Sequence, residues 1–294
     1  MNVRHTVNMK DAREVEAFVV TVLEGMFPGA VWARLHRVFA DVDGMFKGLN
    51  PEFHAIDVEY HDFEHTLRAT ACLALLLEGR NQAGDEPVLD APECELALVS
   101  ALLHDTGYLK SALDHEGTGG KFTYCHVLRS CAFAASYLPQ IGIIEHEIET
   151  VLAAINCTGP ASEMSRLNFR RSVDRIIGAA LGTADYVSQM AAPDYPDDLP
   201  ELFREFRESD EFSGVPKDRR VFQSAEGLIA ATPEFWRGYV LPLLEKEHAG
   251  MYRFLSRPAP DGENDYLTAI EQNIAEIQNR IALAPACNGG ERHT

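Results

Sequence analysis

Apolar side chains recur along most of the chain at spacings of three and four residues, the repeat that places them on one face of an α-helix. The first clear case is the set Val15, Phe18, Val19, Val22 and Leu23. No stretch of the sequence shows the strict alternation of apolar and polar residues that is typical of a half-buried strand. The pattern therefore predicts an all-α fold.

The same periodicity predicts helices along nearly the whole chain, separated by short breaks rich in Gly, Pro, Asp or Asn. None of the breaks, at 81–92, 113–121, 191–200 and 256–264, is long enough to be a domain linker. We therefore expect a single compact multi-helix bundle. After the first helix, the predicted helices cover 30–42, 62–80, 92–105, 123–138, 144–156, 168–190, 199–209, 219–230 and 234–254.

Three segments are expected within this bundle. Residues 1–50 form N-terminal helices that pack on the core, and residues 51–255 form the main domain. Residues 264–284 form an additional amphipathic helix, because five apolar residues recur there at spacings of three and four. This apolar seam can pack on the body or pair with a second subunit in a homodimer, and packing on the body is favoured. The seam consists of Leu267, Ile270, Ile274, Ile277 and Ile281.

Composition narrows the classes of partner. Of 294 residues, 46% are apolar, which is ample for a hydrophobic core. The chain has 45 acidic and 26 basic residues, a formal net charge of −19, which repels polyanions and argues against binding of duplex nucleic acid. A phosphate-bearing substrate would need local positive charge, and a bound metal ion is the economical source of it.

The cysteines and the apolar runs bear on location. Six cysteines, at positions 72, 94, 125, 131, 157 and 287, show no CxxC spacing and follow no export signal, so reduced thiols are expected. The apolar runs near 73–77 and 98–103 are too short to span a bilayer. These features predict a cytoplasmic protein that does not associate with membranes.

Three elements carry side chains of the metal-binding type. His61 and His65 stand four residues apart, so on a helix they would share one face. His104 and Asp105 end an apolar helical run. Asp185 follows nine residues without a charge, and an unpaired carboxylate there would be costly to bury.

Each element also has a structural interpretation. A single histidine on an apolar face is more often a hydrogen-bonded core residue, and a second His-Asp pair occurs at 61–62. Asp185 can also end a helix and pair with Arg175 or Lys121. Together, however, the three elements offer two imidazoles and two carboxylates to one site. Mixed ligands of this kind suit zinc, manganese or iron.

The sequence Tyr-His-Asp-x-x-His at 60–65, followed by His-Asp at 104–105 and a distant Ala-Asp at 184–185, resembles the HD superfamily of metal-dependent phosphohydrolases. The first segment is most similar to the cyclic nucleotide phosphodiesterase catalytic domain, whose pattern is Tyr-His-Asn-x-x-His. The resemblance covers about residues 55–250, is specific at these motif positions, and implies an all-α fold.

The resemblance also implies roles for the matching residues. His65, His104, Asp105 and Asp185 would be ligands of a divalent metal ion, which can be zinc, manganese, iron or magnesium. Asp105 would bridge to a second metal, and His61 would be the proton donor. The candidate catalytic residues are therefore His61 and Asp105.

The chain departs from the family patterns at several positions. Asp62 stands where phosphodiesterases have Asn, and Tyr108 stands where their His-Asp-x-x-His pattern has its last histidine. His126 is either a ligand of a second metal or a group that supports the ligands. The segment 155–158, Ile-Asn-Cys-Thr, replaces the two-histidine element of relatives with a fully protein-ligated pair of metals. One tight metal site and one open, water-rich site are therefore expected.

Other residues have weaker assignments. Asp62 or Glu64 can orient His61 or a ligand imidazole, as carboxylates near metal ligands commonly do. Several basic residues can contact phosphate, although a solvated surface charge is the more frequent role for each of them. These residues are Lys121, Arg129, Arg166, Arg170, Arg171 and Arg175.

Aromatic residues on a late predicted helix can form one wall of a base-binding pocket. Phe235, Trp236 and Tyr239 have helical spacing, which more often indicates core packing. Gln223 lies in the region where cyclic nucleotide phosphodiesterases carry a purine-reading glutamine.

The predicted activity is hydrolysis of a phosphoester in a small nucleotide-type molecule, with a 3',5'-cyclic nucleotide as the first candidate. Three alternatives remain open: a nucleotide phosphomonoesterase of the HD type, a di-iron oxygenase on the same fold, and a non-catalytic module that senses nucleotides. The oxygenase would need more histidines than the stretch around Asn156 provides.

Overall fold

The structure, a computed structural model, describes residues 7–159 and 164–283. Within these ranges the chain is helical, and β-structure is limited to two isolated bridges, Phe53–Ser111 and Arg257–Glu263. The predicted all-α fold is confirmed. The α-helices are α1 (Ala12–Met26), α2 (Ala33–Phe46), α3 (Phe63–Ala83), α4 (Ala91–Leu103), α5 (His126–Tyr137), α6 (Glu145–Ile155), α7 (Ser172–Met190), α8 (Tyr195–Phe212), α9 (Ala225–Glu234), α10 (Leu241–Lys246) and α11 (Asp265–Leu283).

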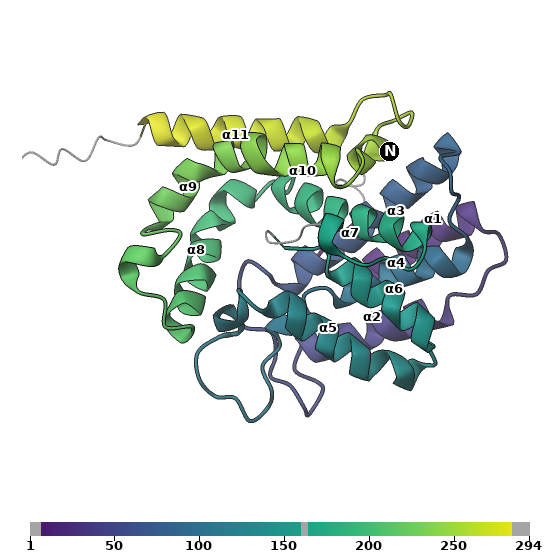
Figure 1. Cartoon of the computed structure of the whole chain (residues 1–294), viewed down its shortest axis with the longest axis horizontal. Coiled ribbons are helices and arrows are strands. Elements are labelled where there is room, and N and C mark those ends of the chain that lie inside the picture. Colours follow the sequence, from purple (N-terminus) through teal and green to yellow (C-terminus); the bar gives the residue numbers. More distant parts are fainter. Residues whose placement is uncertain (1–6, 160–163, 284–294) are drawn as a thin grey trace, which may run out of the picture.

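Helices α3 and α7 pack against each other at the centre of the bundle (Figure 1). Helix α3 is buried on nearly all sides, and Leu67, Leu73 and Leu76 are completely inaccessible to solvent. A helix that is apolar on every face needs neighbours all round it. Helices α1, α4 and α7 provide them, and α6 packs in turn on α4 and α7.

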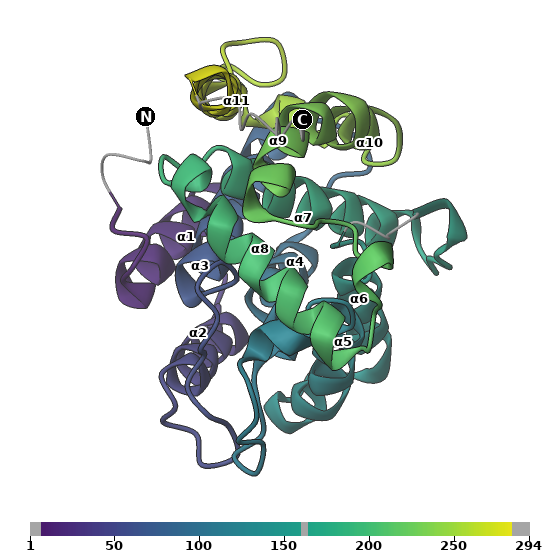
Figure 2. The same cartoon turned by 90° about the vertical axis from the view of Figure 1, so that its left-hand side faces the viewer.

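A second group of helices lies against this centre. Helix α8 packs on the 3₁₀ turn Gly119–Phe122, α9 packs on α8, and α11 lies along α7, α8 and α9. Figure 1 shows α11 running along the top of the molecule, and Figure 2 shows it end-on at the top, beside α9. Ile270, Ile274 and Ile277 of α11 are completely buried. The predicted apolar seam therefore packs on the body from Leu267 to Ile277, whereas its last member, Ile281, is 39% exposed.

The start of α3 differs from the prediction in a way that matters for the site. The helix begins at Phe63, because Asp62 is its N-cap and accepts a hydrogen bond from the backbone N–H of His65 at 2.9 Å. His61 therefore precedes the helix. The prediction that His61 and His65 share a helical face is wrong, although their rings still lie 5.5 Å apart.

Two other helix boundaries differ from those predicted from the sequence. The helix predicted over 234–254 is interrupted: α9 continues as a π-helix, Phe235–Val240, and then as α10. Ala249 and Gly250 have φ values of 53° and 68°, so the chain leaves the right-handed helix there. Helix α8 begins at Tyr195, inside the predicted break 191–200. Pro196 lies in its first turn, where no intrahelical donor is needed, and the helix continues through Pro200.

The described cysteines, Cys72, Cys94, Cys125, Cys131 and Cys157, form no disulfide with one another, and Cys287 lies outside the described residues. Among the helices that the structure describes, none has both the length and the apolar character needed to cross a bilayer.

Candidate metal centre

The four predicted ligands come together between three helices. His65 lies in the first turn of α3, His104 and Asp105 directly follow α4, and Asp185 lies on α7. The Nε2 atom of His65 is 3.1 Å from Asp185 Oδ1 and 3.3 Å from Asp105 Oδ2. The Nε2 atom of His104 is 3.5 Å and 3.2 Å from the same two oxygens. Ligand atoms of His65, His104 and Asp185 all lie within 4.8 Å of one another.

The local sequence explains why His104 and Asp105 stand where they do. Helix α4 begins with a capping box formed by Asp90 and Glu93, and its apolar run is buried. The chain then turns through the 3₁₀ helix Thr106–Tyr108. A side chain at Gly107 would overlap the backbone carbonyl of His126, so only glycine allows α5 to start against this turn.

Glycine has a similar role on α7. A Cβ atom at Gly182 would lie 2.7 Å from His248 Cε1 and 2.8 Å from the carbonyl oxygen of Cys157. The absence of a side chain therefore lets two other segments pack closely against the helix one turn before Asp185. The nine uncharged residues before Asp185 are mostly buried, which leaves its carboxylate as the only acid that this stretch brings to the site.

Backbone and side-chain groups orient the ligand imidazoles. His104 Nδ1 lies 2.7 Å from the carbonyl oxygen of Ala101, so Nδ1 carries a proton and donates it. The side-chain amide of Gln189 lies 3.3 Å from His65 Nδ1. In both residues the Nε2 atom is left to face the carboxylates. The Ala101 carbonyl fixes the tautomer and orientation of the His104 ring, as such partners do for metal-binding histidines, whereas the amide nitrogen of Gln189 restricts only the orientation of the His65 ring.

Three buried atoms of the cluster make no hydrogen bond of normal geometry with the described residues: Nε2 of His65, Nε2 of His104 and Oδ2 of Asp105. Burial by itself would lower the pKa of His65, but the close approach of the Asp105 and Asp185 carboxylates to its ring outweighs burial and raises the pKa to about 9. Convergent, unpartnered nitrogen and oxygen donors are what a divalent cation requires, so the residues present fit a metal ion.

His126 approaches the cluster from the start of α5. Its Nδ1 lies 2.8 Å from the carbonyl oxygen of Thr123, and its Nε2 lies 3.7 Å from Asp105 Oδ1. Burial is the main reason that the pKa of His126 is lowered, which favours the neutral ring. Asp105 thus faces His65 and His104 with one oxygen and His126 with the other. This arrangement suits either assignment of His126, as ligand of a second metal or as support.

His61 has a partner that the sequence did not reveal. Its Nδ1 lies 2.5 Å from Oε2 of Glu205 on α8, and Glu205 Oε1 accepts hydrogen bonds from the backbone N–H groups of Tyr60 and His61. Glu205 is 4% exposed. One carboxylate therefore holds both the backbone and the ring of His61.

The predicted partners of His61 have other roles. Asp62 caps α3, and Glu64 forms ion pairs with Arg68 and Lys10. In these contacts neither carboxylate holds the ring of His61 or of a ligand histidine, contrary to the prediction that one of them orients His61 or a ligand imidazole. A signal for Glu205 existed in the sequence, because it follows Leu202 by three residues and so falls on the apolar face of α8, where an acid is unusual.

Two of the basic residues proposed for phosphate binding hold the loops after Asp105. Lys121 Nζ donates to Asp114 Oδ1 at 2.7 Å and to the carbonyl oxygen of Glu116 at 2.6 Å. Arg129 donates to the carbonyl oxygens of Gly107 and Leu109 at 2.7 and 2.8 Å. Both cations therefore stabilise backbone near the cluster.

The arginines of 166–175 are spread over the 3₁₀ turn Met164–Arg166 and the start of α7. Arg170 pairs with Glu149, and Arg171 pairs with Glu93 and Asp174. Arg175 lies over the ring of Phe169, 5.8 Å from its centre. The ion pairs of Arg170 and Arg171 favour the role of surface charges over contact with phosphate.

The aromatic residues divide into two groups. Trp236 is buried and donates from Nε1 to Glu271 on α11 at 2.7 Å, so it belongs to the core. Phe235 and Tyr239 stack at 5.4 Å, and Phe235 lies 6.3 Å from Tyr186, the neighbour of Asp185. Gln223 donates to the carbonyl oxygens of Lys217 and Arg220, so its amide is used within its own loop.

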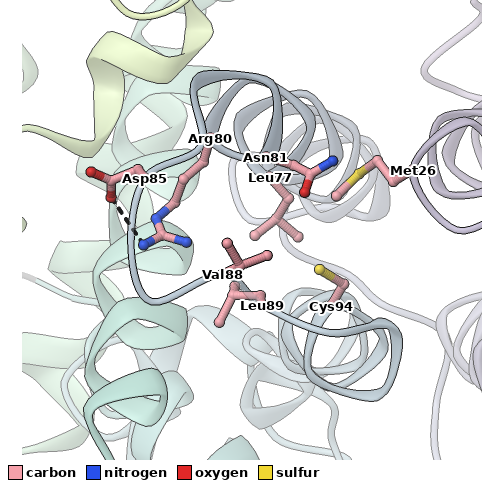
Figure 3. A pocket seen from close by; sticks show the side chains of 8 residues that line it. All are labelled: Met26, Leu77, Arg80, Asn81, Asp85, Val88, Leu89 and Cys94. Carbon is pink, nitrogen blue, oxygen red and sulfur yellow. Dashed lines mark ion pairs between the residues drawn. The ribbon is translucent and has the colours of Figure 1, made fainter.

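Two cavities lie at the other end of the α3–α4 pair. One, lined by Leu77, Arg80 and Cys94, encloses about 10 Å³, about enough for one water molecule. Figure 3 shows Arg80 beside it in an ion pair with Asp85. A larger hollow of about 300 Å³ lies next to Trp32 and Arg34, at the starts of α2 and α4. Neither includes a residue of the His-Asp cluster.

Comparison with known protein families finds no family model that matches the chain, and comparison with curated proteins finds no match either.

Proposed function

We propose that the chain is a metal-dependent phosphohydrolase of the HD type that cleaves a phosphoester in a small nucleotide-like molecule, with a 3',5'-cyclic nucleotide as the first candidate. The observation that carries the proposal is the convergence of His65, His104, Asp105 and Asp185 beside a separately oriented imidazole, His61. The hydrogen bond from Nδ1 to Glu205 leaves Nε2 as the ring atom of His61 that can exchange a proton beside this cluster.

The donor set indicates which metal the site would hold. Two imidazole nitrogens and two carboxylates suit zinc, manganese or iron better than magnesium, which prefers an all-oxygen shell. When bound, such an ion supplies a Lewis acid for a phosphoryl oxygen and lowers the pKa of water. His65, His104, Asp105 and Asp185 would hold it, and Ala101 and Gln189 keep the two rings in place.

The residues of the chain supply the remaining chemistry. In hydrolysis, water adds to phosphorus while the bond from phosphorus to the leaving oxygen breaks, and that oxygen must gain a proton. His61 is the proton donor in this proposal: Nδ1–H stays with Glu205, and Nε2 gives its proton to the leaving oxygen. General acid catalysis of this kind contributes about 10²–10⁴-fold to a rate.

The surrounding charge also supports a metal-dependent activity. The chain carries a net charge of −19, and Lys121 and Arg129 are engaged with their own loops. An anionic substrate therefore has a strong requirement for the positive charge that a cation at the cluster would supply.

The test is a metal analysis combined with a panel of cyclic and linear nucleotides in the presence of manganese. We expect His104→Ala to lose both metal and turnover. We expect His61→Ala to retain metal while its rate falls about 10²–10⁴-fold. His146→Ala, a change at an exposed histidine on α6, is the matched control and should behave as the unchanged protein.

Two outcomes would contradict the proposal. If the protein binds metal and turns over no nucleotide, the sensing alternative replaces the enzymatic one. If His61→Ala keeps the full rate, His61 is not the proton donor. Iron-dependent oxygen uptake would favour the oxygenase. That activity would need further histidines in the stretch around Asn156, and the Asn156 amide instead donates to the carbonyl oxygen of Leu152.

A further inference from the structure

Tyr108 lies in the 3₁₀ turn after His104 and Asp105, and its side chain is completely buried. Its ring stacks on two imidazoles at once. The ring centres of Tyr108 and His61 are 4.6 Å apart with planes inclined by 15°, and those of Tyr108 and His126 are 4.7 Å apart with planes inclined by 20°.

The third distance shows how the three rings are arranged. The centres of His61 and His126 are 5.9 Å apart. If the phenol ring lay between them, two stacking separations of about 3.5 Å each would place them at least about 7 Å apart. The imidazoles therefore lie side by side on the same face of Tyr108.

The backbone that carries this ring is fixed on several sides. The N–H of Tyr108 donates to the carbonyl oxygen of Asp105 at 3.1 Å. Arg129 donates to the carbonyl oxygens of Gly107 and Leu109, the residues on either side of Tyr108. Gly119 packs so closely that a side chain there would overlap the Tyr108 carbonyl. The ring therefore has little freedom to move relative to Asp105.

We infer that the phenol ring of Tyr108 is a positioning surface that sets the planes of His61 and His126 beside the metal-binding cluster. The hydrogen bond from His61 Nδ1 to Glu205 fixes one edge of the imidazole, but the ring can still swing about that bond. Contact with a flat, immobile aromatic face removes this freedom. The same face sets the plane of His126, whose other anchor is the carbonyl of Thr123.

The ring, and not the hydroxyl, carries this role. The Tyr108 hydroxyl is buried and makes no hydrogen bond of normal geometry with the described residues. Phenylalanine would present the same face, whereas leucine would fill similar space without a flat surface. The two substitutions therefore separate positioning by the ring from simple filling of the core.

The geometric part of the inference is tested by proton–carbon correlation spectra of the histidine rings in the zinc-loaded protein. Ring-current shielding by Tyr108 should move the ring-proton signals of His61 and His126 upfield, and His146 is the exposed reference. We expect Tyr108→Phe to keep these shifts and Tyr108→Leu to lose them. Unshifted His61 and His126 signals in the unchanged protein would overturn the inference without any variant.

The functional part rests on the proposed activity and is measured with the same variants. Tyr108→Leu should lower kcat about 10–100-fold, the usual effect of losing a group that supports a site, with KM and metal content nearly unchanged. Tyr108→Phe should restore the lost rate. Full kcat in Tyr108→Leu, or equal loss in both variants, would contradict positioning by the ring. Absence of turnover in the unchanged protein would instead refute the proposed function, and the spectra would still decide the geometry.

Discussion

Glu205 and His61 are 144 positions apart in the chain, yet Oε2 of Glu205 accepts a hydrogen bond from Nδ1 of His61 at 2.5 Å. The contact joins α8 to the segment just before α3. It leaves Nε2 as the atom of His61 that can exchange a proton with a bound molecule.

Replacement of Glu205 by glutamine should slow turnover without affecting the metal. Glutamine keeps the size of the side chain but presents a neutral group to Nδ1, so the ring orientation and tautomer are no longer enforced. We expect kcat to fall about 10–100-fold at unchanged metal content. Glu208→Gln is the matched control, because Glu208 lies one turn further on and binds Thr118 instead. A normal rate in Glu205→Gln would show that the contact is only structural.

Removal of metal should destabilise the protein. A ligand that binds only the folded state, present at one hundred times its Kd, adds about 2.7 kcal/mol to the free energy of unfolding. We expect a chelator to lower the melting temperature, and added zinc or manganese to restore it. Asp185→Asn, which alters one of the converging oxygens, should show a much smaller response. An equal response in both proteins would place metal binding elsewhere.

Gly107 should not tolerate a side chain. The methyl group of Gly107→Ala would overlap the carbonyl of His126, so the start of α5 would have to move, at a cost of about 3 kcal/mol. Gly44→Ala is the control: Gly44 lies within α2 with no atom near the added methyl group, so alanine should stabilise by up to about 1 kcal/mol. Urea unfolding of both variants measures the difference, and equal stabilities would contradict the close approach.

Asn273 links α11 to the end of α7 by two hydrogen bonds, and we expect them to stabilise the protein. Its Nδ2 donates to the carbonyl oxygens of Met190 and Ala192 at 2.9 and 2.7 Å, where the end of α7 leaves acceptors unpaired. We expect Asn273→Ala to lower the free energy of unfolding by about 1–3 kcal/mol. The exposed neighbour Gln272 provides the control, since Gln272→Ala should change stability by less than about 0.5 kcal/mol. Equal losses would show that the two hydrogen bonds contribute little.

His248 should make stability depend on pH in mildly acidic solution. Burial lowers its pKa to about 4, below the value of about 6.5 expected in the unfolded chain. Between these values the unfolded state binds more protons, so stability falls as the pH drops from about 6.5 to about 4. The loss is at most about 3 kcal/mol.

The variant His248→Asn tests this assignment, because asparagine keeps a polar atom near Thr183 but cannot titrate. Its free energy of unfolding, measured with a chelator present, should fall less than that of the unchanged protein between pH 7 and pH 4.5. Parallel pH profiles for the two proteins would show that other groups cause the acid sensitivity.

The helical pattern predicted most of the fold because the buried faces repeat with the period of the helix. The seam of α11 is an example: Ile270, Ile274 and Ile277 were expected to pack on the body, and they are completely buried. The interruption near Phe235–Val240 was missed, since apolar spacing does not distinguish a π-helix from an α-helix over so few residues.

The candidate site was predictable only as far as local motifs reach. His65, His104, Asp105 and Asp185 were grouped from the sequence, and the structure brings them together. Their partners could not be inferred in the same way. Glu205 acts on His61 across the tertiary structure, and the stacking of Tyr108 depends on three rings whose positions no spacing rule specifies.

The proposed metal ligands and the group that orients His61 come from different helices, and this has an evolutionary consequence. The converging ligands come from α3, α7 and the end of α4, whereas the group that orients His61 comes from α8. Under the proposed function, substitutions on α8 would therefore remove turnover while the His-Asp cluster survives intact. A lineage carrying this architecture would then lose the proposed chemistry through a single change at Glu205 and persist as a receptor for the proposed small molecule.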